Sequence, residues 1–275
     1  MQTELVDASL VVTTSWDDGH PSDLRVAELL EKHGLSGTFY VPCSNSEGRS
    51  VMSSGEIAEL GRRFEIGGHT RDHISLTDVA PHVAASQILT NKHWLEDVLG
   101  REVCGFAYVR GRHNRVVRAL VDKAGFRYAR TIKSLMSAPG TDRLQVPTTT
   151  QFFTHTPSTY LRNYVSGGPT LQRAALLVAV LVDDELSERC SRAAEACARS
   201  GGYFHLWGHS WELDEFDLWG ELDRFLGQLR EFDARFVTNA LWCASLVTCT
   251  EAPTAPVRAS QEPARPLSPV RPAIR

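Results

Sequence analysis

The feature that most constrains the fold of this chain is a regular alternation of strand and helix signals between residues 11 and 237. The first unit shows the pattern: a β-branched strand over Val11–Ser15 is followed by an apolar-periodic helix over Leu24–His33, which ends at Gly34. Strands that alternate with helices at even spacing favour a parallel sheet connected by crossover helices. We therefore expect either a closed α/β barrel or a doubly wound sheet.

The same signals recur along the chain. Further strands are predicted over residues 38–41, 64–66, 104–109, 126–131, 144–150, 203–207 and 235–237. Further helices are predicted over residues 56–63, 79–99, 114–124, 170–182, 184–200 and 218–232. We expect a lead-in over residues 1–10, one domain over residues 11–250 and a disordered tail over residues 251–275, because the tail is rich in proline and arginine and poor in large apolar residues.

Composition and charge argue against several function classes. The 275 residues carry a formal net charge of −4, which gives no reason to expect nucleic acid or an acidic membrane as the main partner. The longest apolar run covers residues 174–182 and is far shorter than a bilayer span. The first residues show neither the basic nor the apolar part of a signal peptide, so the sequence predicts a cytoplasmic protein.

The 6 cysteines are scattered through the chain, and none of them forms a C-x-x-C pair. This pattern predicts neither a cysteine zinc site nor a thioredoxin-like redox motif. Without an export signal, we expect these cysteines to be reduced thiols.

Residues of acid–base or metal-binding type follow three of the predicted strands. Because the carboxyl ends of parallel strands gather at one face, where active sites form, these residues can meet although they lie far apart in sequence. The first group is Asp17 and Asp18. Adjacent side chains on a strand point in different directions, so one carboxylate can bind a metal while the other stays free as a base. A turn closed by Gly19 is the alternative reading.

The second group is the segment from Gly67 to His73. His69 and His73 are four residues apart, so on a helical turn they lie on one face and can bind one ion. Gly67 and Gly68 before them allow the backbone to turn tightly. Two surface histidines on a loop are the alternative.

The third group lies in the aromatic segment 203–212. In a strand, His205, Trp207 and His209 share one face. A histidine at the strand end, such as His209, can serve as a general acid. The indoles of Trp207 and Trp211 can form a wall for a sugar ring, whereas His205 is expected to be a hydrogen-bonded interior histidine. An aromatic core strand without a catalytic role is the alternative.

Taken together, one aspartate and two histidines make a three-ligand metal site. Three protein ligands leave a position for water, which is the arrangement of catalytic rather than structural zinc. A second aspartate and a third histidine then remain as base and acid. The combination is far more specific than any of its parts.

These motifs resemble those of the polysaccharide deacetylase family, carbohydrate esterase family 4, which also contains chitin and peptidoglycan deacetylases. The family motif T-F-D-D-G resembles residues 15–19, H-[ST]-x-x-H matches residues 69–73, and a late strand motif that ends in histidine resembles residues 206–209. Their order and spacing agree over residues 10–245. The resemblance implies a single-domain, distorted (β/α)7 barrel.

The resemblance also implies a role for each motif residue. Asp17 is the catalytic base, Asp18, His69 and His73 bind a divalent metal, and His209 is the acid. The ligand types favour zinc, although cobalt or another divalent ion also fits. The implied activity is that of a metal-dependent hydrolase that removes N-acetyl groups from an amino-sugar-containing glycan or sugar intermediate.

One motif departs from the family. Where the family often has R-P-P-[YF]-G, this chain has Ala107-Tyr108-Val109-Arg110-Gly111. Ala107 thus replaces the arginine that usually orients the base. Arg110 replaces an aromatic residue whose backbone N–H helps to bind the oxyanion, and it can still supply that donor. Whether Arg110 or another arginine, such as Arg112, compensates for the missing guanidinium is left open.

Two other functions stay open from the sequence. One is hydrolysis of a cyclic amide or ureide, because some relatives of this fold act on such rings. The other is a carbohydrate-binding protein that has lost catalysis, for which the altered segment 107–111 is the only support. The complete metal triad argues against the first, and the retained Asp17 and His209 argue against the second.

Overall fold

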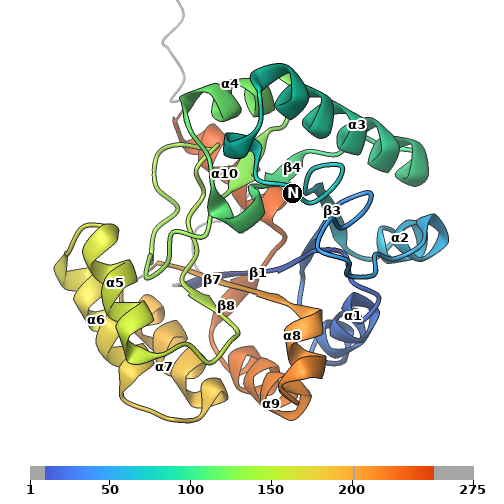
Figure 1. Cartoon of the computed structure of the whole chain (residues 1–275). Helices are drawn as coiled ribbons and strands as arrows, with labels where there is room; N and C mark the ends of the chain where they lie inside the picture. The colour runs from blue at the N-terminus through green and yellow to red at the C-terminus, as the bar shows by residue number, and fades with distance from the viewer. Residues whose placement is uncertain (1–9, 201, 251–275) are drawn as a thin grey trace, which may run out of the picture.

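The computed structural model describes residues 10–200 and 202–250, which form a curled, fully parallel sheet surrounded by helices (Figure 1). The hydrogen-bonded strand order is β5-β4-β3-β2-β1-β7-β6, and β8 pairs with the first residues of β1. The strands are β1 Leu10–Asp17, β2 Thr38–Val41, β3 Glu65–Gly68, β4 Gly105–Ala107, β5 Tyr128–Arg130, β6 Thr150–Gln151, β7 Tyr203–His209 and β8 Ala234–Phe236. The expected distorted (β/α)7 barrel in one domain is confirmed.

The segment that precedes β6 brings the two edges of the sheet together. Val146 forms an isolated parallel bridge with Arg130 of β5, and its N–H donates to the carbonyl of Ala129. A few residues later, Thr150 of β6 pairs with Leu206 of β7. This one segment therefore contacts both β5 and β7 and closes the ring. Little of the segment forms regular strand.

The helices of the described residues cover the outside of the ring, with α3 and α4 at one side and α5, α6 and α7 at the other (Figure 1). They are α1 Asp23–Lys32, α2 Ser54–Leu60, α3 Pro81–Leu99, α4 Arg115–Lys123, α5 Pro157–Ser166, α6 Leu171–Leu181, α7 Leu186–Arg199, α8 Ser210–Glu215, α9 Trp219–Arg230 and α10 Asn239–Thr250. Short 3-10 turns lie at Leu76–Asp78 and Val109–Gly111.

Strand β1 shows how the sequence positions the site. All eight of its residues are buried, because β7 flanks it on one side and β2 and β8 flank it on the other. Val12 and Trp16 pack in the apolar core, whereas the alternate residues Thr13 and Ser15 hydrogen-bond to a histidine of β7. The strand therefore buries apolar side chains on one face and presents polar ones, ending with Asp17, on the other.

The sequence-based elements agree with the structure except where periodicity was weak. Helix α5 was not predicted: only its Tyr160 is buried, while Leu161 and Val165 are exposed, so it lacks an apolar stripe. Helix α8 is too short to show a period, and α10 also was not predicted. The strand expected over residues 144–150 is mostly irregular, and only residues 150–151 form regular strand.

The predicted lead-in and tail lie outside the described residues, apart from Leu10, which begins β1. The boundaries of the domain over residues 11–250 stay a prediction. Among the described residues, no helix has the length and apolar character needed to cross a bilayer.

Candidate active site

Parallel register brings the three predicted groups to the same edge of the barrel. Asp17, the last residue of β1, pairs with His209, the last residue of β7. Val41 at the end of β2 pairs with Gly68 at the end of β3, directly before His69. The strand ends therefore align, and the side chains that follow them meet at one pocket.

The three predicted metal ligands come together as expected. Ligand atoms of Asp18, His69 and His73 all lie within 4.8 Å of one another, and all three residues are buried. Oδ1 of Asp18 is 2.9 Å from Nε2 of His73 and 3.6 Å from Nε2 of His69. Among the described residues, this is the one group of at least three such side chains with metal-ligand spacing.

His69 is oriented by backbone and side-chain contacts around it. Its Nδ1 lies 2.8 Å from the carbonyl oxygen of Ala107, so Nδ1 carries the proton and Nε2 keeps its lone pair for a metal. Its backbone N–H donates to Oδ1 of Asn91 at 2.8 Å, and Nδ2 of Asn91 donates to the carbonyl of Val41 at 3.0 Å. Asn91 therefore ties the loop that bears His69 to helix α3 and strand β2.

The two glycines before His69 have a different role from the one expected. Gly67 and Gly68 belong to β3 and make no turn. A Cβ on Gly67 would lie 2.5 Å from the ring of Tyr40, and one on Gly68 would lie 2.8 Å from Oδ1 of Asn91. They are small because Tyr40 and Asn91 approach the strand closely.

The expectation that His69 and His73 lie on one helical turn is wrong. They lie on an irregular loop in which Thr70 and His73 adopt left-handed φ values of 67° and 52°. Oγ1 of Thr70 accepts a hydrogen bond from the N–H of Ile74 at 3.2 Å, which stabilises the loop. The loop geometry, rather than a helical period, brings the two rings to a centroid distance of 5.1 Å.

Two further side chains contact the triad. Nε1 of Trp211 donates to Oδ2 of Asp18 at 2.9 Å, which leaves Oδ1 directed toward the histidines. Oε1 of Glu47 lies 3.5 Å from Nδ1 of His73. Burial acts to raise the pKa of Asp18, but the neighbouring His69 and His73 outweigh it and hold that pKa well below its usual range.

The arginine missing from the altered motif is replaced from another strand. Nη2 of Arg130, at the end of β5, contacts both carboxylate oxygens of Asp17. Neither arginine considered from the sequence takes this role: Arg110 pairs with Glu47, and Arg112 pairs with Asp78. Arg130 was not considered from the sequence, although a charged residue inside a predicted buried strand could have signalled it.

Arg130 is fully buried between aromatic rings. Its guanidinium carbon lies 5.2 Å from the ring centroids of both Tyr40 and Trp207. Burial acts to lower the pKa of Arg130, but the charge of Asp17 outweighs it and raises that pKa. The Arg130 guanidinium therefore stays protonated beside Asp17 within the barrel.

His209, at the end of β7, is supported by a carboxylate. Nδ1 of His209 is 3.0 Å from Oε2 of Glu212, three residues later at the start of α8. Burial acts to lower the pKa of His209, but Glu212 and the carboxylates of Asp18 and Asp17 outweigh it and raise that pKa to about 9. Glu212 in turn accepts a hydrogen bond from Nε2 of Gln151 at 3.0 Å. Glu212 and Gln151 were both missed in the sequence.

Another missed residue is Asp23, in the first turn of α1. It is completely buried, and burial, with a smaller contribution from the nearby carboxylates of Asp18 and Asp17, raises its pKa well above the usual value. Asp23 is therefore a neutral carboxyl group beneath the site.

The site residues border one pocket, which we call the catalytic pocket. Its volume is about 270 Å³. The lining comprises Asp17, Asp18, Glu47, His69, His73, Arg110, Ile132, Gln151, Trp207, His209, Trp211 and Glu212. All eight residues expected at the site from the sequence are thus brought together, although the side chains of Arg110 and Trp211 are engaged by Glu47 and Asp18.

His205 is an interior histidine, as expected. Its Nε2 lies 2.8 Å from Oγ of Ser15, and its Nδ1 lies 2.7 Å from Oγ1 of Thr13 and 2.8 Å from the hydroxyl of Tyr203. Burial, with a smaller effect from Arg130, lowers the pKa of His205 well below its usual value. A neutral, fully hydrogen-bonded His205 supports β7 beneath the pocket.

Comparison with known families supports the resemblance seen in the motifs. Residues 7–129 match the family described as polysaccharide deacetylase. A comparison with curated proteins finds no match. The family match covers the segment that carries Asp17, Asp18, His69 and His73 and ends directly before Arg130.

Two similar solved structures support the fold. A putative polysaccharide deacetylase from Mycobacterium smegmatis superimposes with a TM-score of 0.64 at 16% identity, over 92% of this chain and 95% of that one. A family 4 acetyl xylan esterase from Clostridium thermocellum, solved with a cobalt ion, has a TM-score of 0.52 at 16% identity, over 88% of this chain and 93% of that one. The Streptococcus pyogenes deacetylase PplD matches over 48% of this chain and 61% of its own length, with a TM-score of 0.45 and 18% identity.

Proposed function

Residues 7–129 match the polysaccharide deacetylase family, and from this match we propose that the chain is a metal-dependent hydrolase that removes N-acetyl groups from an amino-sugar glycan or sugar intermediate. The observation that carries the proposal is the arrangement of one pocket. A metal-type triad, a carboxylate held by Arg130 and a histidine with a raised pKa all border it.

The donor set fits a divalent ion. Two imidazole nitrogens and one carboxylate oxygen converge, and Oδ1 of Asp18 is buried without a hydrogen-bond partner. Such a set suits zinc, and cobalt or another divalent ion of similar preference also fits it. A bound ion would supply Lewis acidity toward the acetyl carbonyl and would lower the pKa of water beside it.

Asp17 is the proposed base. Its carboxylate borders the pocket next to the triad and is free of the triad itself, so it can accept a proton from the attacking water. The contact from Arg130 fixes the orientation of Asp17. Of the two aspartates, Asp17 ends β1 and takes the proton, whereas Asp18 follows the strand with a left-handed φ of 77° and joins the triad.

His209 is the proposed acid. With Nδ1 directed at Glu212, Nε2 is the nitrogen left to donate a proton to the leaving amine. A pKa of about 9 keeps His209 protonated near neutral pH. A backbone N–H, for which Arg110 is the candidate, stabilises the developing oxyanion together with the charge at the triad. Trp207 lines the pocket where an apolar sugar face can rest.

The test is acetate release from an N-acetylglucosamine oligomer by the purified protein. We expect release that a chelator abolishes and that added zinc or cobalt restores. The control is a His69→Ala/His73→Ala variant, which should release no acetate after the same additions. Release that survives both the chelator and the double substitution would overturn the proposal.

The two alternatives from the sequence gain no support from the site. A binding protein needs neither a buried Arg130–Asp17 pair nor a histidine with a raised pKa. Ring opening without acetate release would favour the cyclic-amide alternative. The cytoplasmic location stays a prediction.

A further inference from the structure

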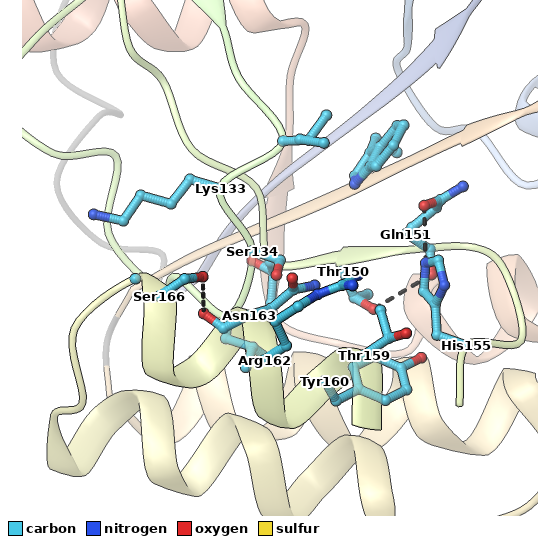
Figure 2. A pocket seen from close by; sticks show the side chains of 15 residues that line it. Lys133, Ser134, Thr150, Gln151, His155, Thr159, Tyr160, Arg162, Asn163 and Ser166 are labelled. Atoms are coloured by element: carbon cyan, nitrogen blue, oxygen red, sulfur yellow. Dashed lines mark hydrogen bonds between the residues drawn. The ribbon is translucent and has the colours of Figure 1, made fainter. Parts of the chain in front are cut away.

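A larger cavity adjoins the catalytic pocket. Its volume is about 540 Å³, which lies in the range of small-molecule binding sites. Ile132, Gln151 and Trp207 line both hollows, so the two lie next to each other at these side chains. We call this larger space the side cavity; Figure 2 shows it from close by.

The side cavity is built by the second half of the chain. Its walls are the loop after β5, the residues that lead into β6, and helix α5. None of these segments belongs to residues 7–129, which carry the family match. In Figure 2, Lys133 lies at one side of the cavity, Gln151 and His155 lie at the other, and Ser134, Thr150 and Asn163 lie between them.

The charged residues that line the side cavity are all positive. Lys133 and Arg162 are the charged residues that line the side cavity, and no aspartate or glutamate lines it. Neither cation has an ion-pair partner in residues 10–200 and 202–250, although most other arginines of the chain do. Two exposed cations beside one hollow, without a neutralising carboxylate, attract an anion.

The rest of the lining offers hydrogen bonds rather than more charge. Hydroxyls of Ser134, Thr150, Thr159 and Ser166 border the cavity. Burial lowers the pKa of His155 below its usual value, the opposing charge of Glu212 does not reverse that shift, and the smaller effect of Arg162 adds to it. His155 is therefore neutral near pH 7, and its Nε2 lies 2.9 Å from Oε1 of Gln151.

The junction of the two hollows has a free donor. Trp207 lies between them, and its indole Nε1 is buried without a hydrogen-bond partner. A buried donor without a partner is costly, and a substrate oxygen at the junction would remove that cost.

From these observations we propose that the side cavity is a second substrate subsite, which binds an anionic phosphate or carboxylate group attached to the acetylated sugar. Lys133 and Arg162 bind the anion, and the Trp207 indole binds the connecting part of the molecule. This inference rests on the proposed deacetylase function, because it assigns the part of the substrate that lies beyond the acetyl group.

The kinetic test compares three acetylated sugars on the metal-loaded protein. N-Acetylglucosamine 1-phosphate carries a phosphate, N-acetylmuramic acid carries a carboxylate, and N,N′-diacetylchitobiose is neutral. We expect a higher kcat/KM for at least one anionic sugar than for the neutral one. Lys133→Ala/Arg162→Ala should remove that preference by raising KM about 10- to 100-fold with kcat little changed.

The matched control removes two positive charges elsewhere. Arg62 and Lys123 are exposed and line neither hollow, so Arg62→Ala/Lys123→Ala should leave the preference intact. A preference for phosphate alone or carboxylate alone would support the inference and identify the anion. Equal kcat/KM for all three sugars, unchanged in Lys133→Ala/Arg162→Ala, would overturn it.

A binding measurement separates this inference from the proposed function. Calorimetric titration of N-acetylglucosamine 1-phosphate into an Asp17→Asn protein, in which turnover is expected to be slow, measures binding, and the Lys133→Ala/Arg162→Ala change in the same background isolates the part that the subsite contributes. Binding that is lost in Lys133→Ala/Arg162→Ala, with no acetate released by the wild type from any sugar, would support the subsite and refute the deacetylase. Chelator-sensitive acetate release without any charge-dependent binding would do the reverse.

Discussion

The two halves of the barrel contribute to the active site in different ways. Residues 10–129 carry the proposed metal ligands and the proposed base in two short motifs, at the ends of β1 and β3. Residues 130–250 carry the groups that complement them: Arg130 contacts Asp17, and Glu212 supports His209, the proposed acid. The proposed ligands and base of the first half lie in short sequence motifs. The groups of the second half act through contacts between residues that are distant in sequence.

This difference shows that an arginine far away in sequence can orient the carboxylate of Asp17. Arg130 and Asp17 are separated by 113 residues in sequence but meet inside the barrel. Ala107 at the end of β4 and Arg130 at the end of β5 are paired in register, so both positions border the same interior. Arg130 therefore supplies the guanidinium contact to Asp17 that Ala107 cannot supply.

The largest expected effect comes from removing the acid or the base. Asp17→Asn or His209→Ala should lower kcat by about 10²- to 10⁴-fold, because each removes a proton transfer. Metal content, measured by elemental analysis, should stay at the wild-type level in both. Loss of the metal in His209→Ala would instead make His209 a ligand. It would contradict the assignment of all the metal ligands to the first half.

Arg130→Leu should be the next largest effect. It leaves the carboxylate of Asp17 buried without its partner, which costs about 3–5 kcal/mol of the free energy of unfolding. Chemical denaturation and kcat should both show the loss. The control Arg112→Ala removes an exposed pair with Asp78 and should cost only about 0–1 kcal/mol.

If Arg130→Leu does not fold, Arg130→Lys keeps the positive charge but not the two-oxygen contact. This variant should fold, retain the metal and lose part of kcat, since a lysine fixes the carboxylate less firmly. Wild-type kcat in Arg130→Lys would contradict a role of guanidinium geometry in orienting Asp17.

Trp211→Phe keeps an aromatic ring at this position but should weaken metal binding by about 10- to 100-fold. The indole N–H is the donor that holds Oδ2 of Asp18, and phenylalanine lacks it. Competition with a chelator of known affinity measures the change. Trp219→Phe is a matched control, because its indole donates to Asp214 instead. Equal metal affinity in both variants would show that the hydrogen bond to Asp18 is dispensable.

Glu212→Gln should produce the smallest effect, a shift in the pH profile. The acid His209 works when protonated, so kcat falls as the pH rises through its pKa. Glu212 raises that pKa, and its removal should move the alkaline limb to lower pH. An unchanged limb in a pH–kcat profile would mean that another group sets it.

Much of the fold and site could be predicted, for physical reasons that also explain the misses. Parallel topology alone brings strand ends together, and the five residues of the motifs lie at or shortly after such ends: Asp17, Asp18, His69, His73 and His209. The spacing of His69 and His73 was informative, although a loop rather than a helix positions them.

The missed residues act over distances that no local pattern encodes. Arg130 depends on the pairing of β5 with the rest of the barrel, and Glu212 depends on the direction in which α8 leaves β7. Helix α5 was missed because exposed apolar residues such as Leu161 and Val165 obscure its period. The side cavity, which α5 lines, was therefore out of reach of the sequence.

The central claim is that the two halves build one metal-dependent site, and metal content tests it most directly. Elemental analysis of the purified protein, after zinc loading and removal of free metal, should give about one ion per chain. His69→Ala/His73→Ala should give none after the same treatment. Zinc that binds equally to both proteins, or to neither, would contradict the account.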